Sequence, residues 1–106
     1  MKKIRVYIKR PNEKGFERII GNKNKDFAEY IGENSIINSF ILNDVVVYMG
    51  VDDYGSPIIG EFNCEICGIP LYGPLIFTGC NLFGCTVSLS DYQIKQIKKL
   101  FTQESS

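Results

Sequence analysis

The chain has 106 residues, is 44% hydrophobic and 23% charged, and carries 12 Lys and Arg against 12 Asp and Glu. A chain of this length and composition is expected to fold as one domain, residues 1–106, around one hydrophobic core. It contains no His. This excludes His-dependent nucleophilic catalysis, zinc sites of mixed Cys and His, and imidazole as a general base.

The first third of the chain predicts a hairpin followed by a helix. Apolar and polar residues alternate over residues 3–9, which is typical of a strand with one buried face and one exposed face. Turn-forming residues at 11–15 then predict a hairpin with residues 16–20. A short helix is expected after Asn24, which would cap its start, and before Gly32, which would end it.

The middle of the chain predicts mostly strands. A turn is expected at residues 43–44, a loop at 52–57 and a further turn at 79–81, because these stretches are rich in Asn, Asp, Gly or Pro. Residues 45–49 are expected to form a central strand. The predicted strands cover residues 36–42, 45–49, 71–78 and 82–89.

The last helix has the clearest sequence signal. Ser90 stands three residues before Gln93, which is the spacing of a capping box, and Leu89 and Ile94 flank this start. Apolar residues then recur at helical spacing as far as Phe101. The fold class predicted is α+β, a mostly antiparallel β-sheet with two helices, one in the first third and one at the C-terminus.

Charge is segregated along the sequence. Residues 1–25 hold nine basic and two acidic residues, a net charge of +7, whereas residues 26–94 hold nine acidic residues and no Lys or Arg. In the first strand, Arg5, Tyr7 and Lys9 share one face, which could hold a nucleic-acid backbone and stack a base. The simpler interpretation is the solvated outer face of an antiparallel sheet, and the sequence pI of about 6.2 is low for a nucleic-acid binder.

The acidic middle of the chain offers a second candidate surface. It would present carboxylates to a basic partner, such as the phosphate-binding groove of another protein. The simpler interpretation is that these acids keep loops solvated. The candidate residues are Asp44, Asp52, Asp53, Glu61 and Glu65.

Four cysteines form a third candidate site. Cys64 and Cys67 form a C-x2-C pair followed by Gly68, and Cys80 and Cys85 form a C-x4-C pair 12 residues further on. Four thiolates at such spacing could bind a tetrahedral zinc ion, although the second pair is wider than usual. Cysteines in such an apolar neighbourhood are more often structural.

The sequence also indicates a compartment. The basic start is followed by a charged strand pattern and not by an apolar signal core, so export is not expected. No apolar stretch approaches the roughly 20 residues that cross a membrane. We therefore expect a cytoplasmic protein with reduced thiols and no membrane contact.

The order of several short motifs resembles domain-of-unknown-function family 3846. A basic opening strand is followed by the stretch 43–49, by Gly60 with Asn63, by the stretch 71–79 and by the helix start 88–94. The similarity covers nearly the whole chain. Where the family often shows a Gly, a Pro, an Asn and an Arg, this chain has Gly-Glu-Phe-Asn-Cys at 60–64, and the four cysteines are not part of the family pattern.

The resemblance implies a setting and no reaction. Family members are small proteins of Gram-positive bacteria, their phages, plasmids and conjugative elements, with no enzymatic activity attached. We therefore expect a non-catalytic accessory protein of a phage or mobile element, without a cofactor, that binds a host or element-encoded macromolecule. A protein partner is favoured over nucleic acid, and anti-defence activity is the most concrete form. The alternative is a zinc module of four cysteines that contacts nucleic acid through the basic strand.

Overall fold

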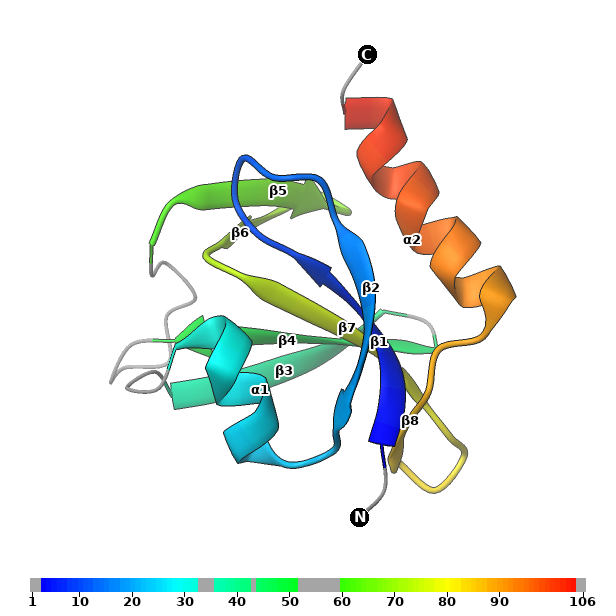
Figure 1. Ribbon diagram of the computed structural model, residues 1–106. Coiled ribbons are helices and arrows are strands. Elements are labelled where there is room, and N and C mark those ends of the chain that lie inside the picture. The colour runs from blue at the N-terminus through cyan, green and yellow to red at the C-terminus, as the bar shows by residue number, and fades with distance from the viewer. Residues whose placement is uncertain (1–2, 33–35, 43, 52–59, 105–106) are drawn as a thin grey trace.

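The computed structural model describes residues 3–32, 36–42, 44–51 and 60–104 (Figure 1). Its sheets are antiparallel, one helix lies in the first third of the chain and one at its C-terminal end, so the predicted α+β class is confirmed. The elements are β1 (Lys3–Lys9), β2 (Phe16–Gly21), α1 (Asn24–Ile31), β3 (Ile36–Leu42), β4 (Val45–Val51), β5 (Phe62–Ile66), β6 (Ile69–Tyr72), β7 (Leu75–Cys80), β8 (Thr86–Val87) and α2 (Asp91–Glu104).

Strand β7 joins two hairpins into one sheet. The strand order is β2-β1-β7-β4-β3, and β8 pairs with the end of β7. Phe77 of β7 is opposite Tyr7 of β1 on one side and Val47 of β4 on the other. Strand β4 is therefore central, as predicted, while β5 and β6 form a separate two-stranded hairpin.

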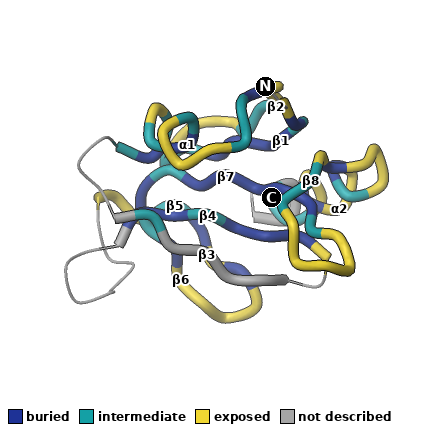
Figure 2. The backbone as a smooth tube through the Cα atoms, turned by 90° about the horizontal axis from the view of Figure 1, so that it is seen from below, coloured by how far each residue is buried: buried dark blue, intermediate teal, exposed yellow. Residues whose placement is uncertain are grey.

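Both faces of the sheet are covered. On one face, side chains of β1 and β7 pack against Phe27 and Ile31 of α1. On the other face, β4 and β7 pack against Ile94 and Ile97 of α2, and the β5–β6 hairpin adds Cys64, Ile66 and Leu71 to the same cluster. Strands β1, β7 and β4 are accordingly buried over much of their length (Figure 2).

This double coverage corrects the prediction that β1 has one exposed face. Ile4, Val6 and Ile8 are buried on one face, as expected, in the cluster that includes α1, but Tyr7 on the opposite face is only 3% exposed. Its ring lies parallel to that of Phe101 of α2, with the ring centroids 6.2 Å apart. A strand between two others, with a helix over each face, has no solvated side over this part of its length.

The two helix starts differ in how well the sequence predicted them. The capping box of α2 is confirmed, because the backbone N–H of Gln93 donates to Ser90 Oγ at 3.1 Å and that of Ser90 donates to Gln93 Oε1 at 2.8 Å. The predicted cap of α1 is wrong, because Asn24 is already the first helical residue and Lys23 occupies the N-cap position. The backbone N–H of Lys23 donates to Asp26 Oδ2. Gly32 ends α1 with a φ of +134°, which favours glycine.

Two of the predicted strands have different limits. The expected strand 71–78 is divided at Gly73, which has a φ of +73° and donates its N–H to the carbonyl of Glu61. Strand β7 continues into the expected turn at 79–81 as far as Cys80, since Gly79 lacks a side chain that would collide with the carbonyl of Ser88. The expected strand 82–89 is wrong except for β8, because the chain turns at residues 82–84.

Replacing Ser90 with Ala should destabilise the protein by about 1 kcal/mol, because the variant loses the side-chain acceptor at the start of α2. Urea unfolding followed by circular dichroism measures this loss. Ser90→Asp, which keeps an acceptor, is the matched control and should stay near the wild-type midpoint. Equal midpoints for Ser90→Ala and wild type would show that this cap does not stabilise α2.

Candidate functional site

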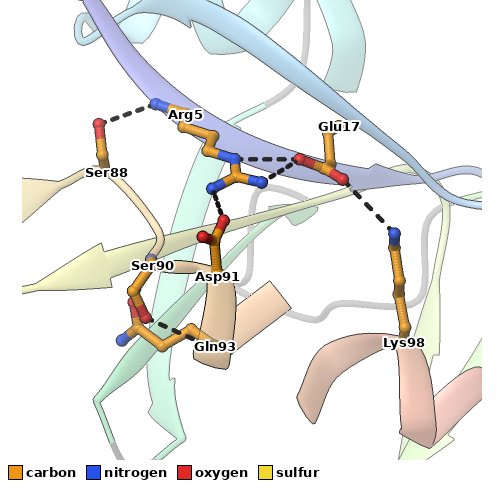
Figure 3. Close-up of polar contacts among 7 residues, drawn as sticks. All are labelled: Arg5, Glu17, Ser88, Ser90, Asp91, Gln93 and Lys98. Carbon is orange, nitrogen blue, oxygen red and sulfur yellow. Dashed lines mark hydrogen bonds and ion pairs between the residues drawn. The ribbon is translucent and has the colours of Figure 1, made fainter. Parts of the chain in front are cut away.

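Arg5, the first residue of the predicted basic face, connects β1, β2 and α2 (Figure 3). Its guanidinium donates to Glu17 Oε1 of β2 through two nitrogens, at 2.6 and 3.0 Å, and to Asp91 Oδ1 of α2 at 2.5 Å. Its backbone N–H donates to Ser88 Oγ, and its carbonyl accepts from the N–H of Leu89. Arg5 therefore fixes the start of α2 on the sheet and does not present an unpaired charge to solvent.

The hydrogen bonds and positive charges of this network lower the pKa of both of its carboxyl groups. The hydrogen bond from Arg5 holds the pKa of Asp91 below its ordinary value of 3.8. The same guanidinium, and then Lys98 at 3.4 Å, lower the pKa of Glu17 from 4.5. Both groups are exposed, so water and salt weaken their contribution.

Acid should weaken this network. The pKa values of Glu17 and Asp91 are lowered in the folded state. Their contribution to stability is therefore fully present above pH 4.5 for Glu17 and above pH 3.8 for Asp91, the ordinary pKa values of the two groups. It is lost as the pH falls through the lowered pKa values of the folded state. We expect Arg5→Met to raise both pKa values and to lose less Tm than wild type between about pH 5 and about pH 3. Carboxyl titration by NMR, with thermal unfolding at each pH, measures both effects. Unchanged titration midpoints in Arg5→Met would contradict this assignment.

The other two residues of the predicted basic face are buried. Tyr7 and Lys9 are 3% and 9% exposed, so neither the candidate surface for a nucleic-acid backbone nor the favoured solvated outer face forms at these two residues. Burial raises the pKa of the Tyr7 hydroxyl, with a smaller effect from the negative charge of Glu17, so this phenol is neutral near pH 7. Lys9 lies at the edge of a pocket of about 620 Å³ between the β1–β2 turn and the start of β5.

The predicted acidic residues lie in separate settings where the structure describes them. Asp44 is exposed and lines a groove of about 510 Å³ beside α2. Glu61 accepts a hydrogen bond at 2.7 Å from Asn12 in the β1–β2 turn, and Glu65 is exposed on β5. Asp52 and Asp53 lie outside the described residues.

The four cysteines are spread over two regions. Cys64 is buried in the cluster on the α2 side, as expected of a structural cysteine, and Cys67 is exposed at the tip of the β5–β6 hairpin. Cys80 ends β7, and Cys85 is exposed just before β8. The described part of the chain, which includes all four, holds no group of three or more Cys, Asp or Glu side chains placed to bind a metal. The zinc alternative therefore has no grouped set of ligands in this fold.

The turn before β8, residues 81–85, is the feature that the sequence prediction missed. We call it the Asn81 loop. Asn81 Oδ1 accepts from the backbone N–H groups of Phe83 and Cys85, both at 2.9 Å. The N–H of Asn81 donates to the carbonyl of Cys85, and that of Gly84 donates to the carbonyl of Asn81, each at 3.0 Å. Four hydrogen bonds thus hold the backbone of a five-residue turn.

Two large apolar side chains project from this fixed turn. The relative exposure of Leu82 is 101% and that of Phe83 is 90%. Their apolar character suggested a strand, whereas Asn81 and Gly84, whose φ is +80°, were the signal for a turn. The structure therefore places adjacent hydrophobic side chains where folding buries neither of them.

Comparisons with known proteins add no further guide. A scan against protein-family models found no match, and searches of curated proteins and of solved structures found none either. Within the described residues, no helix is long and apolar enough to cross a membrane.

Proposed function

We propose that the protein is a non-catalytic cytoplasmic binding protein that uses the Asn81 loop to dock into an apolar pocket of a protein partner. The observation that carries this proposal is the exposure of Leu82 and Phe83 on a hydrogen-bonded turn. Burying one such side chain contributes about 1.5–3 kcal/mol, and folding of this chain uses neither. That free energy is available for association.

The order of the loop supports the same proposal. A loop that is already held in its bound shape loses little conformational entropy when a partner binds, so more of the contact energy appears as affinity. Protein interfaces concentrate their binding energy in a few anchors that fill pockets, and a projecting aromatic side chain suits that role.

The biological setting of the proposal comes from the resemblance to family 3846. The partner would be a host or element-encoded protein, and the chain an accessory protein of a phage or mobile element. Inhibition of a host defence protein is the most specific form of this role. Binding alone is sufficient for it, since a small domain that occupies a partner's pocket blocks that pocket without chemistry.

Substituting both Leu82 and Phe83 should abolish binding of the partner. Affinity capture from host lysate compares three proteins: the wild type, the loop variant Leu82→Ser/Phe83→Ser, and the control variant Ile69→Ser/Tyr92→Ser. The control removes two apolar side chains that are exposed elsewhere on the surface. We expect a partner on wild type and control but not on the loop variant. With the purified partner, Phe83→Ala should raise Kd roughly 30-fold, the equivalent of about 2 kcal/mol. Capture of no protein, or of the same proteins by all three, would refute the proposal.

Loosening the loop should weaken binding while both anchors remain. Asn81→Ala removes the acceptor for two backbone N–H groups, so we expect Kd to rise about 3- to 10-fold and the Phe83 amide to become more mobile in ¹⁵N relaxation. Asn81→Asp keeps an oxygen acceptor and should stay close to wild type. If Asn81→Ala leaves Kd unchanged while the loop becomes mobile, preorganisation does not contribute to binding.

A further inference from the structure

A nearly buried lysine, Lys9, lies away from the Asn81 loop and is the starting point for a second candidate site. Lys9 is 9% exposed. Its Nζ donates to the carbonyl of Arg10 at 2.9 Å and to Asn63 Oδ1 at 3.3 Å, and lies 5.5 Å from the centre of the Phe101 ring. In the described part of the chain, no carboxylate lies within ion-pair distance of this ammonium. Lysines are seldom buried to this degree unless paired.

Within the described residues, the contacts of this ammonium are all with neutral groups, two oxygens and the Phe101 ring. A protonated lysine carries three N–H bonds, and neutral oxygens accept two of them here. Carbonyl and amide oxygens satisfy hydrogen bonds but do not neutralise the positive charge. A negatively charged acceptor beside the third N–H would supply both a hydrogen bond and the missing charge.

The space for such an acceptor is present. Lys9, Asn63 and Phe101 line the pocket of about 620 Å³, together with Tyr7 and Lys14. The lining residues include two lysines and one acid, Glu13, and the nearby Glu61 carboxylate is already hydrogen-bonded to Asn12 of the lining. The neutral Tyr7 hydroxyl lies so close to Gly15 that a side chain at position 15 would collide with the hydroxyl.

We propose that this pocket binds a small organic anion. Its phosphate or carboxylate group would accept a hydrogen bond from Lys9 Nζ, with Lys14 adding positive charge at the rim. Its apolar part would lie against the ring of Phe101. This inference goes beyond the proposed docking function and does not depend on it, because the Asn81 loop and this pocket share no residue.

The burial of Lys9 favours a small ligand over a nucleic-acid chain. An extended phosphate backbone needs several basic side chains along an open surface. Arg5, four positions before Lys9 on the same face of β1, is already paired with Glu17 and Asp91. Over the described residues of β1, Lys9 therefore has no second unpaired basic side chain of its own strand face beside it, and a compact anion needs none.

NMR titration tests the proposal with three probes: inorganic phosphate, phenyl phosphate and benzoate. Each is added to ¹⁵N-labelled protein up to about 20 mM, a range that reveals millimolar Kd values. We expect saturable shifts at the amides of Gly15 and Asn63. Tighter binding of phenyl phosphate than of benzoate would identify a phosphate ester as the natural class, and the reverse order a carboxylate. No saturable shift with any probe would overturn the proposal.

Three variants show whether Lys9 is responsible. Lys9→Met keeps an unbranched side chain, removes the charge and should raise Kd at least about 10-fold while the spectrum stays dispersed. Lys95→Met, on the exposed surface of α2 and outside the pocket, should bind like wild type. Lys14→Glu reverses an exposed charge at the rim and should weaken binding even if Lys9→Met does not fold. Unchanged affinity in folded Lys9→Met, or in Lys14→Glu if Lys9→Met is unfolded, would refute the site.

Discussion

The fold depends on the burial of one strand, β7, on both faces and along both edges. Leu75 and Phe77 point into the cluster beneath α2, and Ile76 points into the cluster beneath α1, and all three are fully buried. Strands β1 and β4 satisfy the backbone hydrogen bonds of β7 from either side. Both hairpins of the large sheet join along this strand, and both helices pack over it.

The same constraint explains which parts of the fold could be predicted from the sequence. Local signals were reliable where the interaction is itself local, as in the capping box of Ser90 and Gln93 or the stop at Gly32. The alternation in residues 3–9 showed correctly that the two faces of β1 differ. It could not show that α2 covers the second face. Tyr7 and Lys9 count as polar in the sequence pattern, but their long apolar parts pack under α2 while their polar tips reach the pocket.

The candidate sites were less accessible to sequence reasoning. Leu82 and Phe83 read as strand residues because apolar side chains are normally buried, and only the surrounding hydrogen bonds reveal a turn. Lys9 read as a surface charge, and its significance comes from Asn63 and Phe101, which lie more than 50 positions away in the chain. Sites assembled from distant segments leave little trace in one sequence, whereas the four cysteines left a clear motif that the fold does not gather.

The position of β7 in the sequence also affects how the chain reaches its native state. Tyr7 and Phe77 are paired neighbours although 70 residues separate them. Both outer hairpins are synthesised before their common neighbour exists, and contacts across such long loops form slowly. Until β7 is present, the edges of β1 and β4 that it covers are accessible to self-association, so the native sheet forms only after residues 75–80 join the two hairpins.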